Sequence, residues 1–332
     1  MTHLPKKILV TGSAGFIGSN FVRLELQHDK NIEIISLDKL TYAGNLKNLE
    51  NLCDPSRHKF IQGDICDERL LQTILKEHQI DSIVHFAAES HVDRSILNPR
   101  AFIDTNILGT FNLLQAAREN KIARFHHIST DEVYGSLEKN TPAFTEENAY
   151  QPNSPYSASK AGSDHLVRAF AHTYGLPITL SNCSNNYGVN QHPEKFIPTV
   201  IRACIEKKTI PVYGDGLNIR DWIFVDDHCA AVSLIIREGK LNQTYNVGGN
   251  CELSNLQLVK TICELMDKRF SNNAPHYNLI EFVTDRLGHD WRYAIDNTKI
   301  QTTLGWKPTT SLRNGLEKTI DYYVGAECDR SK

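Results

Sequence analysis

The chain has 332 residues, of which 40% are hydrophobic and 23% charged, a composition that is typical of a folded globular protein and excludes a largely disordered chain. Lys and Arg number 36 against 39 Asp and Glu, so the formal net charge is -3 and disfavours a dedicated nucleic-acid binder. No apolar run reaches the roughly 18 residues of a membrane-spanning helix, and we expect neither a membrane span nor a secretory signal.

The cysteines and histidines lack the spacings that indicate metal sites. The eight cysteines include no Cys-x-x-Cys pair, and the 14 histidines include no His-Glu-x-x-His motif. A chain of this length buries a sufficient core without disulfides. We therefore expect reduced cysteines, a cytoplasmic location and no metal.

Short apolar runs alternate with helical patterns through the first half of the chain. Apolar strands separated by helices indicate a parallel sheet that is covered by helices on both faces, with right-handed crossovers. The sequence therefore predicts an α/β fold with a doubly wound parallel (Rossmann) sheet. Strands are expected over residues 6–11, 32–38, 58–64, 81–87, 123–130 and 177–183, and helices over 15–26, 68–78, 99–119 and 154–174.

The second half of the chain has shorter elements between loops rich in Asn, Gly and Pro. We predict a Rossmann domain over residues 1–185 and a smaller mixed α/β substrate lobe over 186–332. A strand near 244–247 is expected to return to the main sheet.

Three glycines follow the first predicted strand and open the first helix: Gly12, Gly15 and Gly18. Residues without side chains let backbone N–H groups approach a pyrophosphate, and the helix N-terminus adds partial positive charge. Asp38 follows Gly18 by 20 residues, at the end of the second strand. A carboxylate there accepts both ribose hydroxyls and repels a 2′-phosphate, which favours NAD over NADP. The alternative for Asp38 is a plain strand-end cap.

Other residues of the predicted NAD site lie in the same glycine turn or near the ends of later strands, where open α/β sheets bind their ligands. Small residues at the end of the fourth strand leave room for the cofactor. The set comprises Phe16, Ile17, Asp64, Ile65, Ala87, Ala88 and Cys183.

The glycine spacing Gly-x-x-Gly-x-x-Gly resembles that of the extended short-chain dehydrogenase/reductase family. The resemblance predicts a Tyr-x-x-x-Lys signature, which is present as Tyr156 and Lys160. On a helix these side chains share one face. A nearby ammonium and a cationic nicotinamide should lower the tyrosine pKa from about 10, so that Tyr156 acts as a base. The alternative is an exposed Tyr and Lys at a Ser-rich helix start.

Asp131 and Glu132 follow Thr130 at the end of the fifth strand. Thr130 is expected to hydrogen-bond the reacting sugar hydroxyl. A redox-only enzyme needs no such acidic pair, whereas an elimination needs both a base and an acid. Two carboxyl groups in one closed pocket separate into an ionised and a protonated state. The alternative is a solvated acidic loop.

With these residues in place, the chain resembles the nucleotide-sugar 4,6-dehydratases of the extended short-chain family. The resemblance runs from Ile8 to about Tyr323 and rests on segments such as TGSAGFIGSN, STDEVYG, SPYSASKAGSDH and VYGDGLNIRDWIFVDDHC. It implies dTDP-glucose as substrate, tightly bound NAD, oxidation at C4, elimination across C5–C6 and reduction at C6, which serves deoxysugar synthesis such as that of rhamnose. It also implies catalytic roles for Thr130, Asp131, Glu132, Tyr156 and Lys160.

The same resemblance places nucleotide-sugar contacts in the second half of the chain. Arg220 and Arg286 are forked donors suited to a diphosphate, and Tyr213 would stack on the base or bound its pocket. The remaining substrate candidates are Ser90, Thr130, Asn185, Lys195, Phe196, Asn255 and His289. For Arg220 the alternative is a local ion pair with Asp221.

Several readings stay open. Other nucleotide-sugar enzymes share the Tyr-x-x-x-Lys signature, including UDP-glucose 4-epimerase, UDP-glucose or GDP-mannose 4,6-dehydratase and UDP-glucuronate decarboxylase. A non-catalytic NAD-sensing protein would have little reason to keep Asp131 and Glu132 in register with Tyr156. Thymine and uracil differ by one methyl, and no residue identifies that contact. By family analogy we expect a homodimer joined by the helices over 99–119 and 154–174.

Overall fold

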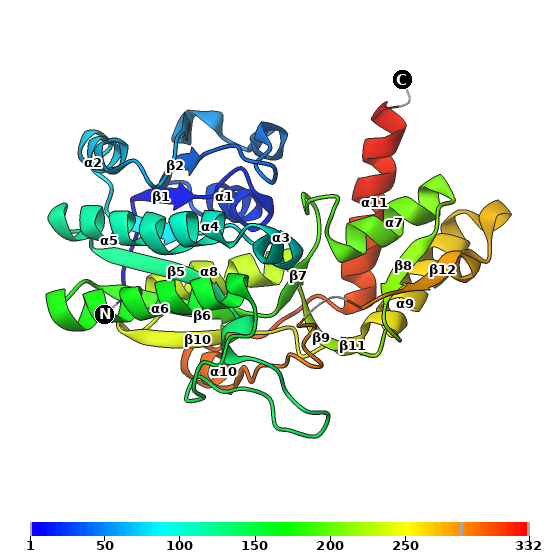
Figure 1. Ribbon diagram of the computed structural model, residues 1–332. Coiled ribbons are helices and arrows are strands. Elements are labelled where there is room, and N and C mark those ends of the chain that lie inside the picture. The colour runs from blue at the N-terminus through cyan, green and yellow to red at the C-terminus, as the bar shows by residue number, and fades with distance from the viewer. Residues whose placement is uncertain (1, 286–287, 331–332) are drawn as a thin grey trace.

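The computed structural model describes residues 2–285 and 288–330, which form a large lobe around one sheet and a smaller lobe beside it (Figure 1). The strands of the large sheet are β1 (Lys7–Thr11), β2 (Glu33–Asp38), β3 (His58–Gln62), β4 (Ser82–His85), β5 (Arg124–Thr130), β6 (Ile178–Cys183) and β10 (Gln243–Val247). The helices around it are α1 (Phe16–His28), α2 (Glu68–Glu77), α3 (Val92–Leu97), α4 (Pro99–Phe102), α5 (Thr110–Glu119), α6 (Pro155–Tyr174), α8 (Val225–Glu238) and α10 (Thr298–Leu304).

Within the described residues the large sheet has seven strands in the order β10-β6-β5-β4-β1-β2-β3, and every neighbouring pair is parallel. This order is that of a doubly wound sheet, in which the chain reverses direction across the sheet next to β1. The predicted α/β Rossmann architecture is therefore confirmed. β10 pairs with β6 at the edge of the sheet, so the second half of the chain contributes to the large lobe.

Helices cover both faces of this sheet because successive strand residues point to opposite sides. Leu9 belongs to a core with buried side chains from α2, α5 and α6, whereas the next residue, Val10, packs in a second core with α1 and α8. In Figure 1, α5 and α6 run across the front of the sheet. Two apolar layers thus fix β1 and the turn that follows it.

The predicted helix over 99–119 is interrupted by a π-helical segment, Ile103–Gly109, between α4 and α5. The wider turn places the Asn106 side chain against the loop after β4, where it accepts from the Glu89 N–H at 2.8 Å and donates to the Glu89 carbonyl at 3.0 Å. Its amide also donates to the Ser159 hydroxyl of α6 at 2.8 Å. These long-range bonds, which periodicity does not encode, account for the change of helix type.

α6 begins where its sequence predicts. Ser154 and Ser157 form a reciprocal capping box, Pro155 occupies the first turn, and Gly175 ends the helix in the left-handed conformation at φ 68°. The helix start that carries Tyr156 is therefore defined by local chemistry.

The smaller lobe combines a three-stranded mixed sheet, in the order β11-β9-β7, with a parallel pair of β8 and β12. Its core includes Trp222, Ile201, Leu258 and Leu316. The strands are β7 (Asn185–Tyr187), β8 (Ile210–Tyr213), β9 (Ile219–Phe224), β11 (Glu252–Ser254) and β12 (Ile280–Val283), and the helices are α7 (Phe196–Glu206), α9 (Asn255–Arg269) and α11 (Leu312–Arg330). None of the helices in the described part of the chain is both long enough and apolar enough to cross a membrane.

Candidate active site

The turn between β1 and α1 has almost no room for side chains. A Cβ on Gly12, whose φ is +68°, would lie 2.6 Å from the Ala87 nitrogen, and a Cβ on Gly18 would lie 2.3 Å from the Gly12 oxygen. The Ser13 hydroxyl in this turn is buried and has no hydrogen-bond partner among the described residues. A backbone cradle at a helix N-terminus, with a spare buried hydroxyl, fits a dinucleotide pyrophosphate.

Asp38 ties the end of β2 to this turn. Its carboxylate accepts from the Ala14 N–H at 2.9 Å and from the Leu40 N–H at 2.8 Å. Burial raises the pKa of Asp38, and these backbone donors oppose that rise. The carboxylate therefore caps the strand end, and its hydrogen bonds to a ribose remain a prediction.

The other predicted NAD residues lie around the same edge of the sheet. Asp64 pairs with the Lys39 ammonium at 2.7 Å; burial opposes its ionisation, but the bond from Lys39 holds the pKa of Asp64 below its usual value. Ile65 is buried, and Ala87 and Ala88 directly follow the Phe86 amide that bonds back to β1. The Cys183 thiol at the end of β6 donates to the Ser129 carbonyl at 3.3 Å, and burial raises its pKa to about 12. Lys39 is a partner that sequence reasoning missed.

Gly18→Ala is expected to weaken NAD binding about tenfold or more, because its Cβ would collide with the Gly12 backbone, which cannot move without opening the cradle. NAD released from the denatured purified protein measures the loss. Gly162→Ala is the control, since its Cβ would meet only the end of the Ile107 side chain, at 3.1 Å. Equal NAD content in both variants would contradict this function of the turn.

The predicted catalytic residues meet where β5 ends and α6 begins. Thr130 ends β5, and Asp131 and Glu132 follow it in a 3-10 turn, Asp131–Tyr134. The Thr130 hydroxyl accepts from the Glu132 N–H at 3.2 Å, donates to the Asp131 carboxyl at 3.3 Å and hydrogen-bonds the Tyr156 phenol. The structure thus brings the phenol and both acids around one threonine hydroxyl.

Asp131 lies in surroundings that favour its neutral form. It is buried, and its Oδ2 has no hydrogen-bond partner among the described residues. Burial raises the pKa of Asp131 well above its usual value, the charges of Glu132 and Asp221 raise it further, and the Arg220 guanidinium opposes them. Asp131 is therefore a carboxylic acid able to donate a proton, and Asp221 is a contributor that sequence reasoning missed.

The expected lowering of the Tyr156 pKa depends on bound nicotinamide and stays a prediction. Burial raises that pKa well above 10, and the charge of Glu132 adds to the rise, whereas the Thr130 hydrogen bond opposes it. The local pattern of Tyr and Lys one turn apart carries no information about this burial. Ionisation of the phenol must be favoured by charge that arrives with the ligands.

Lys160 lies one helical turn after Tyr156 and is 4% exposed. Its ammonium donates to the Ile128 carbonyl at 2.9 Å. Burial lowers the pKa of Lys160, and the Asp164 carboxylate opposes that effect most strongly. Its contact with the nicotinamide ribose remains a prediction.

Arg220 reaches the site from β9 in the smaller lobe. Its guanidinium donates to the carbonyls of Ile219 at 2.7 Å and Asp290 at 3.0 Å and lies 4.4 Å from the centre of the Tyr293 ring. Asp221 accepts instead from the N–H groups of Gly249 and Cys251, at 2.8 and 2.6 Å. Arg220 is thus held close enough to act on Asp131, and its contact with a diphosphate remains a prediction.

A second group of predicted substrate residues connects the lobes. The Lys195 ammonium, at the start of α7, donates to the carbonyl of Ser90, in the loop after β4, at 2.9 Å. Phe196 stacks on Trp222 with ring centres 6.4 Å apart. The Asn185 Oδ1 is buried without a hydrogen-bond partner among the described residues, so this oxygen is available to a ligand donor.

The remaining substrate candidates lie on the smaller lobe. The rings of Tyr213 and His289 are 6.4 Å apart and nearly perpendicular, and the His289 Nδ1 lies 2.6 Å from Asp285 Oδ1. Asn255 begins α9. Arg286 lies outside the described residues.

Comparison with known proteins places the chain among sugar-nucleotide enzymes. A family model described as GDP-mannose 4,6 dehydratase matches residues 9–319. The dTDP-glucose 4,6-dehydratase of Shigella flexneri is 51% identical over 335 residues, which cover 96% of this chain and 92% of that protein. The dTDP-glucose 4,6-dehydratase 1 of Escherichia coli K12 is 50% identical with the same coverage.

Solved structures agree. The crystal structure of DesIV, a dTDP-glucose 4,6-dehydratase from Streptomyces venezuelae with NAD and TYD bound, matches with a TM-score of 0.90 and 44% identity over 97% of this chain and 98% of that chain. A UDP-glucose 4-epimerase from Thermotoga maritima with UDP-glucose matches with a TM-score of 0.87 and 28% identity over 97% and 99% of the two chains. The resemblance inferred from the sequence is confirmed. This chain belongs to the dTDP-glucose 4,6-dehydratase family, within the extended short-chain dehydrogenase/reductases.

Proposed function

We propose that this chain converts dTDP-glucose into dTDP-4-dehydro-6-deoxyglucose and water with tightly bound NAD. The observation that carries the proposal is the cluster at the end of β5, where the Thr130 hydroxyl bonds a tyrosine phenol and a buried Asp131, whose pKa burial raises, beside Glu132. An epimerase has no use for a second proton donor at this position. The half-identical dehydratases of Shigella flexneri and Escherichia coli support the same reaction.

Each proton transfer of the reaction has its own residue in this chain. When bound, NAD supplies the redox chemistry: a hydride leaves C4 for the cofactor and is later returned to C6. Tyr156 takes the proton of the C4 hydroxyl, which Thr130 orients, and the resulting C4 ketone acidifies the C5 hydrogen. Glu132 removes that C5 proton, while Asp131 protonates the C6 oxygen, which leaves as water. The proton on Glu132 exchanges with solvent, and Glu132 then donates a solvent-derived proton to C5 as C6 is reduced.

The proton balance assigns one more task to Thr130. After one turnover Tyr156 holds one proton more, and Asp131 one proton fewer, than at the start. The Thr130 hydroxyl bonds both groups, with its oxygen 3.3 Å from the Asp131 carboxyl. We infer that it passes the proton from the phenol back to the acid and so resets the site.

The decisive experiment incubates the purified protein with dTDP-glucose in deuterated water and analyses the product by mass spectrometry. The proposed function requires loss of water and one deuterium at C5. Unchanged substrate, or an epimer of the same mass, would refute it. UDP-glucose in a parallel incubation tests the nucleotide, since one methyl contact is worth about 1–3 kcal/mol.

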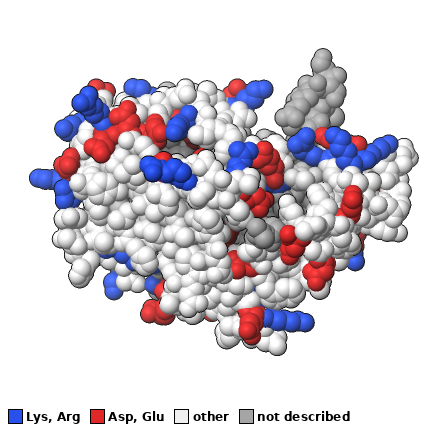
Figure 2. Space-filling view, in the orientation of Figure 1, with Lys and Arg blue, Asp and Glu red and all other residues white. Residues whose placement is uncertain are grey.

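We further propose a homodimer formed through the helices in front of the sheet. Figure 2 shows few charged side chains on the face over α5 and α6. Large apolar side chains are exposed on α3, the π-helical segment, α5 and the end of α6, namely Ile96, Leu97, Ile103, Leu108, Phe111 and Tyr174. Exposed apolar side chains gathered on one face are typical of a protein interface.

Leu108→Glu is expected to turn the dimer into a monomer, because it would bury a charge in that interface. Light scattering after size exclusion should show the mass fall from about twice 37.5 kDa to that of a single chain. Leu241→Glu is the control, because Leu241 is 43% exposed, as against 46% for Leu108, but precedes β10 at the sheet edge. A wild-type monomer would refute the dimer.

We also infer a cytoplasmic location. The seven cysteines whose side chains the structure describes are all free thiols. Free thiols are the usual state in a reducing compartment, which supports this location.

A further inference from the structure

A cluster of buried polar side chains lies behind Lys160, on the side away from the predicted sugar site. The His127 Nε2 on β5 is 3.4 Å from the Lys160 ammonium and 3.2 Å from the Asp164 Oδ1 on α6. The side chains of His127 and Asp164 are 0% exposed. One ring nitrogen therefore lies between a buried cation and a buried carboxyl group, and the reaction described above uses neither residue.

Lys160 needs such a partner because an unpaired ammonium is costly to bury. Burial lowers the pKa of Lys160, and among the groups that oppose this effect Asp164 is the strongest, followed by Cys183. Asp164 and Lys160 are four residues apart on α6, so they lie on the same side of the helix. Lys160 thus has its main counter-charge on its own helix.

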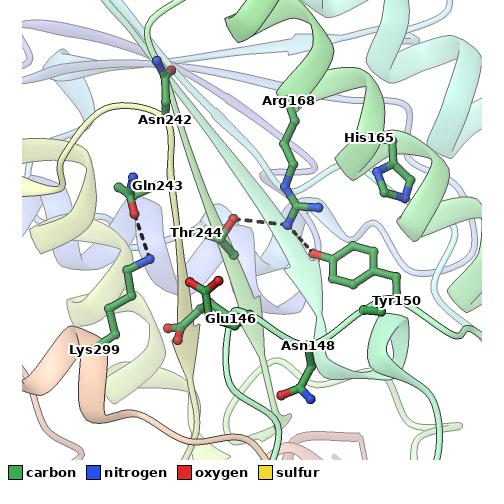
Figure 3. Close-up of a pocket in the computed structure, with 11 residues that line it drawn as sticks. Glu146, Asn148, Tyr150, His165, Arg168, Asn242, Gln243, Thr244 and Lys299 are labelled. Atoms are coloured by element: carbon green, nitrogen blue, oxygen red, sulfur yellow. Dashed lines mark hydrogen bonds between the residues drawn. The ribbon is translucent and has the colours of Figure 1, made fainter.

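Asp164 has polar partners on its other side that oppose the effect of burial on its pKa. The Ser129 hydroxyl donates to its Oδ2 at 2.8 Å, and the Tyr150 hydroxyl is a further hydrogen-bond partner. Arg168 donates to the Tyr150 oxygen at 2.7 Å and to Thr244 at 3.2 Å. Figure 3 shows the Arg168 side chain pointing toward the Tyr150 hydroxyl and Thr244. These residues line a pocket of about 300 Å³ beside β10. Burial raises the pKa of Asp164, whereas Lys160, Ser129 and Arg168 lower it.

We propose that Asp164 is a positioning residue of this enzyme: a buried counter-ion that, with His127 between them, holds the Lys160 ammonium charged and in place beside Tyr156. The inference rests on the proposed function only for its effect on catalysis. Asp164 affects the reacting atoms only through Lys160. The glycine turn and the pair of Asp131 and Glu132 do not depend on Asp164.

The groups that face this pair come from each neighbouring element. Tyr156 and Arg168 lie on α6 itself, His127 on β5, His85 on β4, Cys183 on β6, and Tyr150 in the loop before α6. The pKa values of His85 and His127 lie well below 6.5 because both rings are buried. Both rings are therefore neutral near neutral pH. On the alkaline side Tyr156 and Lys160 lose protons: loss from Tyr156 favours C4 oxidation, and loss from Lys160 opposes it.

The first test follows C4 oxidation alone. The test uses the Glu132→Gln enzyme, in which elimination is blocked and proton donation by Asp131 therefore does not affect the measured rate. The rate of reduced-cofactor formation is measured as a function of pH. Adding Asp164→Asn should slow this step about tenfold and move its alkaline limb to lower pH by about one unit, because Lys160 then loses its proton more easily. NAD content and the KM for the sugar nucleotide should be unchanged, since Asp164 touches neither.

Ser163→Ala is the matched control. The Ser163 hydroxyl is 3.3 Å from the same His127 nitrogen and is neutral. If the cluster only packs α6 against β5, both substitutions will act alike and neither will move the limb. An unmoved limb in Asp164→Asn would overturn the proposal.

A double-mutant cycle gives a readout without activity and remains informative if Asp164→Asn folds poorly. Lys160→Met leaves a buried carboxylate, Asp164→Asn leaves a buried ammonium, and the double variant leaves neither. The double variant should therefore melt above the Asp164→Asn single variant. Additive losses in melting temperature would refute the charge interaction between Lys160 and Asp164. Because melting needs no substrate, this result stands apart from any failure of the wild-type enzyme to dehydrate dTDP-glucose.

Discussion

Replacing Tyr156 with phenylalanine is expected to lower kcat about 10³-fold, within the usual range for loss of a general base. The phenol lies against Thr130 and beside Glu132 and Asp131, and no other described tyrosine has this combination of neighbours. Without the phenolate no group takes the C4 hydroxyl proton, so neither reduced cofactor nor product should form. Product formation from dTDP-glucose, measured with the NAD content of each preparation, checks the expectation.

The pH dependence follows from the same group. Burial raises the pKa of Tyr156, so kcat/KM of the wild-type enzyme should increase with pH as the phenol loses its proton, and the residual rate of Tyr156→Phe should lack this increase. Tyr187→Phe, in the smaller lobe, is a control that removes a buried phenol bonded weakly at 3.4 Å to the Leu312 carbonyl. Turnover by Tyr156→Phe at a tenth of the wild-type rate or more would be incompatible with the proposed base.

Glu132→Gln should stop the reaction after oxidation, with a fall in product formation of about 10²- to 10⁴-fold. The amide has the shape of the carboxylate but cannot take the C5 proton. The C4 hydroxyl can still be oxidised, because Tyr156, Lys160 and Thr130 are unchanged. Reduced-cofactor absorbance should therefore appear after mixing with dTDP-glucose and persist, and deuterium should not enter C5.

Asp131→Asn provides the complementary result. Its raised pKa makes Asp131 a proton donor, and the amide cannot donate a proton to the C6 oxygen. The elimination step of the wild-type enzyme should slow as pH rises through the raised pKa of Asp131, whereas the oxidation step should not. The Asp131→Asn variant should still oxidise C4 but should eliminate water slowly. Glu147→Gln, on the exposed loop beside β10, is the control in which an acid outside the site is replaced by its amide. For the Glu132→Gln prediction, normal product formation would mean that another residue removes the C5 proton.

Local patterns in the sequence determined the parts of the protein that depend on neighbours along the chain. Alternating strands and helices predicted the parallel sheet, the glycine spacing predicted the turn around Gly12 and Gly18, and helical periodicity placed Tyr156 and Lys160 on one face. The acidic pair after Thr130 could be placed because parallel strands end at the ligand edge of such a sheet. These features follow from backbone geometry over a few residues.

Tertiary structure alone decided the electrostatics of the site. Asp221 and Arg220 come from β9 to act on Asp131, His127 comes from β5 to lie between Lys160 and Asp164, and burial raises the pKa of Tyr156 in the protein without its ligands. Charge and desolvation depend on every group that packs around an atom, and those groups are far apart in the chain. The π-helical turn at Asn106 has the same origin, because its partners Glu89 and Ser159 are distant in sequence. The sequence by itself therefore predicted which residues meet at the end of β5, and the packing of distant segments decided in which direction their pKa values shift.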